Sequence, residues 1–246
     1  MKVLILKRTH LICAMVLTFA LLLAIIILSV YKASDSEDVM ISYIIKPALI
    51  IDAGHGGADG GAESINGMCE APLNLDISLK LRDMMSFIGV TSVLTRDNDE
   101  SLDFSADKTI RENKSADIKA RLSIAEDNPE CDFLSIHLNK FEQEKYHGAQ
   151  VFYSPNNEDS SDLATFIQKA FQVLDPDNKR RAKLASDDIY LMKNIESPAV
   201  TIECGFLSNN EEARLLSQSD YRTKIVLAIF DGYIDYLEMS ENKYAT

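Results

Sequence analysis

Four side chains in this sequence are of the types that hold metals or move protons. They are His55, Glu70, His137 and Glu203. Two histidines and one carboxylate give a zinc ion three protein ligands and leave a fourth position open, which is the pattern of catalytic rather than structural zinc. A second carboxylate nearby could accept a proton from water as the water attacks a carbonyl. These residue types therefore suggest metal-assisted hydrolysis.

The loop around His55 is unusually rich in glycine. The segment AGHGGADGGAE, residues 53–63, contains five of the ten glycines of the chain. Glycine lets the backbone approach other groups closely, at an entropic cost when the segment becomes ordered. Two interpretations are open: backbone N–H groups that cradle an anion, or a tight loop that presents His55 to a metal. The loop has no lysine and no G-K-[ST] ending, which weakens the phosphate interpretation.

The elements that must position these residues alternate along the chain. Apolar runs predict buried strands, and apolar residues at helical spacing predict helices. Strands are expected at residues 45–52, 90–95, 133–137, 149–153 and 199–203. Helices are expected at residues 73–88, 118–125, 162–174 and 225–236. This alternation predicts an α/β fold with a mostly parallel twisted sheet and helices on both faces.

Such a sheet would bring the four side chains to one edge, because sites in these folds form outside the carboxyl ends of the strands. His55 lies just past the first predicted strand, and His137 and Glu203 each end one. Glu70 lies at the entrance to the first predicted helix. We therefore expect the four side chains to meet.

Each of these residues also has an ordinary structural interpretation. A lone histidine here could be a hydrogen-bonded core residue, and Glu70 could be a carboxylate favoured by the dipole at a helix start. Glu203 could pair with an arginine such as Arg96. The combination with the glycine loop favours a site. His147 is the competing ligand, but it precedes a predicted strand rather than following one.

Composition excludes several partners. The chain of 246 residues has a net charge of −13, and its first 34 residues carry four basic and no acidic side chains, so the remainder carries −17. Nucleic acid or anionic lipid is not expected as the main partner, because phosphate binding needs a basic surface. Beyond Cys13, the three cysteines Cys69, Cys131 and Cys204 form no C-x-x-C pair and no disulfide framework.

The amino-terminal segment predicts export. Residues 11–30 contain no charge and no proline, which is about the length of helix that spans a bilayer. Basic residues precede this run, acidic residues follow it, and His10 flanks it, so the remaining chain should lie outside the cytoplasm. A cleaved signal peptide is the alternative, although its apolar core is usually shorter and the exit Tyr31-Lys32-Ala33 is a poor cleavage site. We expect an anchor or signal at 1–33, a linker at 34–44 and a catalytic domain at 45–240.

Six segments covering about residues 46–238 resemble the zinc-dependent N-acetylmuramoyl-L-alanine amidases of the Amidase_3 family, in the family's order. They are IIDAGHGGADGGAE, CEAPLNLDISLKLRDMM, VTSVLTRDND, FLSIHLNK, GAQVFYS and PAVTIECGFLSNNEEARLL. The resemblance implies one zinc ion held by His55, Glu70 and His137, with Glu203 as the catalytic glutamate. The implied reaction is cleavage of the amide between N-acetylmuramic acid and the L-alanine of peptidoglycan stem peptides.

Three residues depart from the family's pattern or from what we expected beside a site. Leu138 follows the second histidine, where the family often has a small residue, and Cys69 and Cys204 each adjoin a site residue. These thiols raise slightly the chance of a thiolate ligand. Neighbours on a strand point to opposite faces, so Cys204 should point away from Glu203.

A membrane anchor on a bare catalytic domain resembles the CwlD branch of the family in spore-forming bacteria. In that branch, removal of the stem peptide is an early step toward muramic-δ-lactam in the spore cortex, so the resemblance implies a role connected with sporulation and germination. The domain would then act in the cell wall or the forespore intermembrane space, or be secreted if the segment is cleaved. An accessory regulatory protein is a further partner that this resemblance allows. The alternatives are a zinc peptidase cutting within the stem peptide and a non-catalytic wall-binding module.

Overall fold

The computed structural model describes residues 17–19, 21–24 and 49–244. The chain divides into two units, Met1–Lys46 and Pro47–Thr246. Residues 17–19 and 21–24 are helical. The rest of the apolar run expected to span a membrane, residues 11–30, lies outside the described residues. The same is true of residues 45–48, the expected start of the first strand. Within the described ranges, none of the helices combines the length and the apolar composition that crossing a membrane requires.

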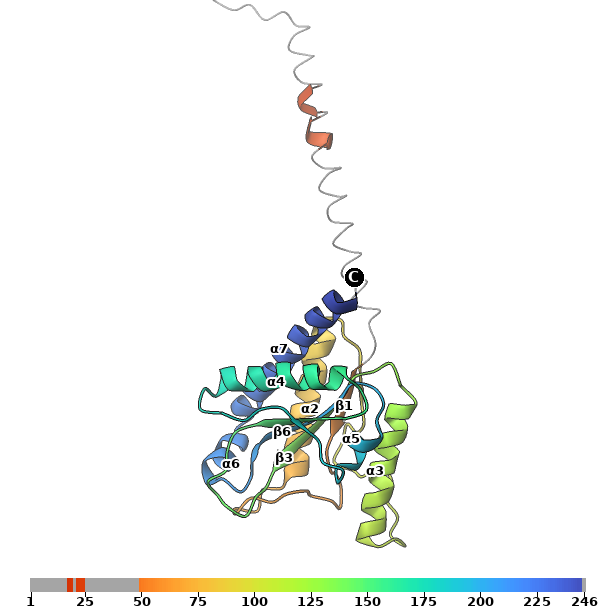
Figure 1. Cartoon of the computed structure of the whole chain (residues 1–246), viewed down its shortest axis with the longest axis vertical. Helices are drawn as coiled ribbons and strands as arrows, with labels where there is room; N and C mark the ends of the chain where they lie inside the picture. The colour runs from red at the N-terminus through yellow and green to blue at the C-terminus, as the bar shows by residue number, and fades with distance from the viewer. Residues whose placement is uncertain (1–16, 20, 25–48, 245–246) are drawn as a thin grey trace, which may run out of the picture. The chain divides into compact units, whose positions relative to one another are not determined.

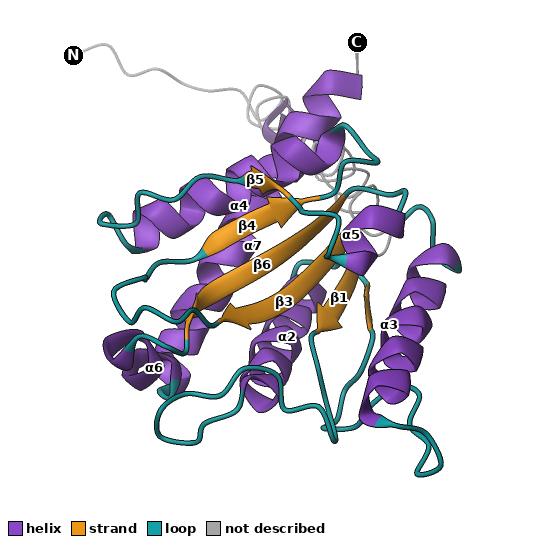
Figure 2. Ribbon diagram, turned by 60° about the horizontal axis from the view of Figure 1, so that its bottom comes forward, coloured by secondary structure: helices purple, strands orange, loops and turns teal. Residues whose placement is uncertain are grey.

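A six-stranded sheet forms the centre of the second unit (Figures 1 and 2). Its order is β2-β1-β3-β6-β4-β5. The strands are β1 (Leu49–Ala53), β2 (Ser92–Leu94), β3 (Phe133–Asn139), β4 (Gln150–Tyr153), β5 (Lys183–Leu184) and β6 (Ala199–Phe206). All neighbouring strands are parallel except β4 and β6, which are antiparallel. The predicted mostly parallel α/β fold is therefore confirmed, with one reversed pair that makes the sheet mixed.

Six helices complete the described part of this unit, residues 49–244. They are α2 (Glu70–Phe87), α3 (Ile110–Glu126), α4 (Asp159–Leu174), α5 (Tyr190–Asn194), α6 (Asn210–Leu216) and α7 (Ser219–Tyr244). The four helices that the sequence predicts are α2, α3, α4 and α7. The short elements α5, α6 and β5 were not predicted, because a segment of two to seven residues is too short to show a hydrophobic period.

Helices cover the two faces of the sheet unequally. On one face, the alternate strand residues Ile51, Ile136 and Ile202 are fully buried in a core with α2, α4 and α7. On the other face, Ile50 and Phe133 are buried with residues of α3 and α5. Figure 2 shows α2, α4 and α7 behind the sheet, whereas α3 and α5 lie toward the β1 side and leave much of the near face of β6 and β4 uncovered.

The glycine loop is bound to the start of α2. The backbone N–H of Glu70 donates to Ala62 O at 2.9 Å, and that of Ala71 donates to Gly60 O at 3.1 Å. Pro72 lies in the first turn of α2, where a missing N–H leaves no hydrogen bond unmade. The start of α2 and the loop after β1 therefore form one connected piece of backbone, and this piece places Glu70 beside His55.

Candidate active site

Three of the four predicted site residues meet at the carboxyl ends of β1 and β3. Glu70 Oε1 lies 2.9 Å from His137 Nδ1, and Glu70 Oε2 lies 3.3 Å from His55 Nε2. The two imidazoles meet edge-on, with ring centroids 5.0 Å apart. One potential ligand atom from each residue lies within 4.8 Å of those of the others. The arrangement offers a metal two nitrogens and one carboxylate oxygen.

Glu70 is held rigidly between the histidines. Its carboxylate accepts hydrogen bonds from Ala62 N at 2.8 Å, Leu138 N at 2.9 Å and Asn74 Nδ2 at 3.0 Å, and the residue is only 2% exposed. Burial by itself raises the pKa of Glu70, but the hydrogen bonds with His137 and His55 outweigh it and hold that pKa below its usual range. Glu70 is therefore ionised and fixed in direction.

His55 is oriented by a second carboxylate. Its Nδ1 lies 2.9 Å from Asp59 Oδ2, which leaves Nε2 facing Glu70. Asp59 in turn pairs with Lys114 at 2.9 Å. Burial works to lower the pKa of His55, but the hydrogen bonds with Asp59 and Glu70 raise it to about 9. A carboxylate on the far nitrogen fixes the ring and its tautomer, as in many histidine ligands of metals.

Close contacts explain two of the loop glycines. A Cβ on Gly54 would lie 2.3 Å from Nε2 of His137, and a Cβ on Gly61 would lie 2.6 Å from Oε2 of Glu70. Gly61 also has φ +70°, in the left-handed region that favours glycine. His55 itself has φ +62°, which is uncommon for a residue with a side chain. The glycines therefore let the loop curl against the three side chains.

Two buried arginines, which the sequence analysis did not identify as supports, hold this loop through its carbonyls. Arg121 of α3 pairs with the fully buried Asp52 and donates to the carbonyls of Ala53 and His55. Arg96 donates to Ala53 O at 2.8 Å and Gly54 O at 3.1 Å. Both donate into the strand–loop junction that carries His55. The only sequence signal for them was the charged Asp52 within an apolar strand.

Glu203 lies directly beside His137. The two residues are register partners in the parallel strands β3 and β6, so their side chains share one face of the sheet. Glu203 Oε2 is buried, and it has no hydrogen-bond partner within the described chain. Burial is the main cause that raises the pKa of Glu203 to about 7; His137 opposes the rise and Glu70 adds to it. The suggested pairing with Arg96 is not formed, since that guanidinium donates to backbone carbonyls.

Neither His137 nor Glu203 ends its strand, which corrects the sequence analysis. β3 continues to Asn139 and β6 to Phe206, with a shift of register between His137 and Asn139. Such an irregularity lets strand pairing continue past the partly buried pair His137 and Glu203. The two side chains still reach one site because they are paired across the sheet.

His147 and the cysteines lie outside the three-residue group. Among the described residues, His55, Glu70 and His137 form the only set of three metal-binding side chains with converging ligand atoms. The reason given for setting His147 aside was wrong, because β4 is antiparallel to β6 and its first residues lie at the same edge as the site. Cys204 is buried in the core of the α2–α4–α7 face, which confirms that it points away from Glu203.

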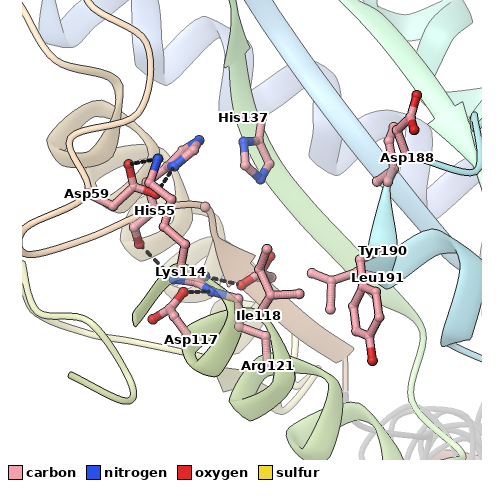
Figure 3. A pocket seen from close by; sticks show the side chains of 13 residues that line it. His55, Asp59, Lys114, Asp117, Ile118, Arg121, His137, Asp188, Tyr190 and Leu191 are labelled. Carbon is pink, nitrogen blue, oxygen red and sulfur yellow. Dashed lines mark hydrogen bonds and ion pairs between the residues drawn. The ribbon is translucent and has the colours of Figure 1, made fainter. Parts of the chain in front are cut away.

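A cleft of about 350 Å³, which we name the Lys114 cleft, opens beside the three-residue group (Figure 3). In Figure 3, Lys114, Ile118 and Arg121 of α3 lie between the His55 loop and the segment that carries Tyr190 and Leu191. The cleft has room for part of a large substrate next to His55 and His137.

An α/β sheet with a histidine–glutamate–histidine group and an unpartnered glutamate at one edge defines a candidate metal-dependent hydrolase. Comparison with known families then narrows this class. Residues 49–235 match the Amidase_3 family, described as N-acetylmuramoyl-L-alanine amidase. The chain belongs to this family, and the resemblance found in the sequence is confirmed.

Individual relatives agree with this assignment. A germination-specific N-acetylmuramoyl-L-alanine amidase of Bacillus subtilis is 33% identical over 76% of this chain and 78% of its own length. The CwlD amidase of Clostridioides difficile, solved in complex with the GerS lipoprotein, is 42% identical with a TM-score of 0.76, over 79% of this chain and 100% of that one. The catalytic domain of CwlV from Paenibacillus polymyxa is 27% identical with a TM-score of 0.66, over 78% and 98%.

Proposed function

We propose that this protein hydrolyses the amide between N-acetylmuramic acid and L-alanine in peptidoglycan, using one zinc ion bound by His55, Glu70 and His137. The observation that carries the proposal is the placement of Glu203. Its unpartnered carboxylate is the register neighbour of His137 and lies next to a group of three potential ligands. A buried carboxylate oxygen without a hydrogen-bond donor, such as Oε2 of Glu203, is costly for the fold, so its presence there calls for a functional reason.

The three side chains fit a zinc ion. Zinc–nitrogen and zinc–oxygen bonds of about 2.0–2.2 Å at tetrahedral angles place neighbouring ligand atoms roughly 3.3 Å apart. His137 Nδ1 lies 2.9 Å from one oxygen of Glu70 and His55 Nε2 lies 3.3 Å from the other. With one ligand atom taken from each residue, the three atoms lie within 4.8 Å of one another, so the three side chains can supply one ligand each to a single ion. When bound, zinc would supply a Lewis acid that polarises a carbonyl and makes a water molecule more acidic.

The protein's own groups would supply orientation and proton transfer. Asp59 holds the ring of His55, and the three donors to the carboxylate of Glu70 fix its direction. Glu203, with its raised pKa of about 7, can take a proton from water and return it to the departing amine near neutral pH. A pKa close to the working pH suits a group that must both accept and release a proton.

The spore cortex is the setting that the relatives favour. The Bacillus subtilis relative is named as germination-specific, and the Clostridioides difficile neighbour is a CwlD amidase. We therefore propose that stem-peptide removal by this chain prepares the cortex for muramic-δ-lactam formation. The same neighbour was solved with a lipoprotein, which supports the proposal that an accessory protein binds this chain.

Product analysis tests the reaction. The full-length chain should release peptides with free L-alanine amino termini from purified peptidoglycan, as seen by mass spectrometry, and should leave intact glycan strands. New amino termini at other residues would identify a peptidase acting within the stem peptide. Binding to the wall without any released peptide would identify a non-catalytic module. A Glu203→Gln protein serves as the inactive control.

We also propose that the amino-terminal segment anchors the protein in a membrane with the catalytic domain outside the cytoplasm. The support is the uncharged run at residues 11–30, flanked by basic residues before it and acidic residues after it. In cells, the full-length chain should fractionate with membranes, and a chain that begins after residue 33 should not. A mature protein whose amino terminus lies near Ser34 would instead show that the segment is a cleaved signal peptide.

A further inference from the structure

A second hollow lies at the β6–β4 side of this sheet edge, whereas the Lys114 cleft lies toward β1 and α3. It has a volume of about 260 Å³. We name it the Arg180 groove, and its lining residues are Asn139, Phe141, Tyr146, Gln150, Arg180 and Phe206. They come from the carboxyl ends of β3 and β6, the start of β4 and two loops. Among the described residues that line it, Arg180 alone carries a charge.

The groove is connected to Glu203 through Gln150, which lines it. Gln150, the first residue of β4, is the register partner of Glu203 in the antiparallel pair, so both side chains leave the sheet on the same face. Gln150 Oε1 accepts a hydrogen bond of 2.8 Å from Arg180 Nη1. With neighbouring strands about 4.8 Å apart, the guanidinium lies roughly 7–10 Å from the Glu203 carboxylate. That distance corresponds to about two residues of extended peptide.

The guanidinium of Arg180 is fixed in place, and its nearest counter-charge, the carboxylate of Glu212, acts on it without forming a salt bridge. Its Nε donates to His147 O at 2.7 Å, and its plane covers the ring of Phe206, with 4.5 Å between Cζ and the ring centroid. No carboxylate forms a salt bridge with it in the described part of the chain, and Nη2 has no protein hydrogen-bond partner there. The domain has a large excess of acidic residues, yet this guanidinium is fixed in position with Nη2 available as a donor. Such an arginine is suited to bind an anionic group of the substrate.

Charge differs on the two sides of the catalytic group. The Lys114 cleft is lined by four aspartates, Asp52, Asp59, Asp117 and Asp188, against two cations, Lys114 and Arg121. Lys114 already pairs with Asp59, and Arg121 already pairs with Asp52 and Asp117. The cleft therefore offers a substrate carboxylate no unpaired lysine or arginine, whereas neutral sugars with hydroxyl and acetamido groups need none. The uncleaved glycan carries its lactyl group as an amide, so carboxylates of the substrate belong to the peptide.

We propose that the Arg180 groove binds the peptide part of the substrate, with Arg180 pairing with a free carboxylate about two residues beyond the cleaved amide. This inference rests on the proposed amidase function. It orients the substrate across the site, with the glycan toward the Lys114 cleft and the peptide over Gln150. A bidentate arginine–carboxylate pair would then select peptides that keep this carboxylate free.

The experiment removes each partner of the pair in turn. Rates of peptide release are measured for glycan strands carrying native stem peptides and for the same strands after chemical amidation of their carboxylates. A hydrogen bond to a charged group changes binding by roughly 10- to 100-fold. For wild type, we expect kcat/KM to fall by that factor when the carboxylates of the strands are amidated, mainly because KM rises. For Arg180→Gln, we expect a kcat/KM that is already low on native strands and falls no further on amidated strands.

Matched variants separate contact from general charge and from folding. Arg181→Gln removes the same charge from the neighbouring, exposed residue. This variant should prefer native over amidated strands to the same extent as wild type. Arg180→Lys keeps the charge without the planar fork and should be intermediate. Melting temperature and zinc content should match wild type throughout.

Three outcomes would overturn the inference: wild type that cleaves both strands equally well, Arg180→Gln that keeps the wild-type preference, or Arg181→Gln that loses it. A wild-type protein that releases no L-alanine peptides from either strand would instead overturn the proposed function.

Discussion

Replacing Glu203 by glutamine should abolish nearly all amidase turnover while the protein keeps its zinc and its fold. Glutamine preserves the shape of the side chain and one hydrogen-bonding oxygen but cannot accept a proton. General acid–base groups typically contribute about 10²- to 10⁴-fold in rate, and the loss should fall in this range. The change should appear in kcat rather than in KM, because Glu203 is proposed to act on the proton and not to bind the wall polymer.

Zinc content decides what the loss of turnover means. Glu203 is not one of the three converging side chains, so the variant should bind zinc as tightly as wild type. A Glu203→Gln protein that is well folded but free of zinc would show that Glu203 is itself a ligand. The proton would then need another acceptor.

Stability of the metal-free protein gives an independent measurement. The pKa of Glu203 is raised from 4.5 to about 7, so the folded state holds an extra proton between these pH values and stability falls as pH rises through that window. Glu203→Gln should remove this contribution, and above pH 7 the metal-free variant should melt at a temperature equal to or higher than wild type. An unchanged pH dependence would indicate that Glu203 is better solvated than its surroundings suggest.

Local patterns predicted the long elements of this fold and three side chains, His55, Glu70 and His137, that the structure brings together. Ile51, Ile136 and Ile202 belong to apolar runs that are typical of buried strands, and the structure confirms those strands. Strand direction was harder to predict, because the alternation of predicted strands and helices along the chain does not fix the direction of each strand. Ten residues and no helix separate β3 from β4, and parallel connections usually need a dozen or more with a helix. The short connection between β3 and β4 was therefore the feature of the sequence that could have predicted the antiparallel direction of β4.

The supporting contacts of the site could not be predicted, because they join residues far apart in the chain. Arg121 meets Asp52 across 69 positions, and Arg96 meets the loop carbonyls across 42 or 43. The periodicity of a sequence predicts only which residues of one helix or one strand share a face. Glu203 could be identified from its motif, but its partnerless oxygen and its neighbour Gln150 depend on sheet register. The sequence therefore indicated the candidate reacting groups and left the basis of their orientation unknown.

Removing the side chain of His137 should cost the protein both its zinc and its activity. His137→Ala leaves His55 and Glu70 as the only converging ligands, and two protein ligands hold zinc poorly. Loss of a supporting partner alone weakens zinc binding by about 10- to 100-fold, so loss of a direct ligand should weaken it by more than about 100-fold. Metal analysis of the purified protein and peptide release from peptidoglycan measure the two effects.

His147→Ala is the matched control, since it removes an imidazole from the same edge of the sheet but from outside the three-residue group. It should keep one zinc ion per chain and close to full activity. The fold should survive in both variants, because His137 is only partly buried and the apolar side chains of β3 hold the strand in the sheet. If His137→Ala retains stoichiometric zinc while His147→Ala loses it, the ligand assignment is wrong and the loop before β4 must supply the second histidine. If both retain zinc, the metal is held elsewhere and the geometry around Glu70 reflects hydrogen bonding alone.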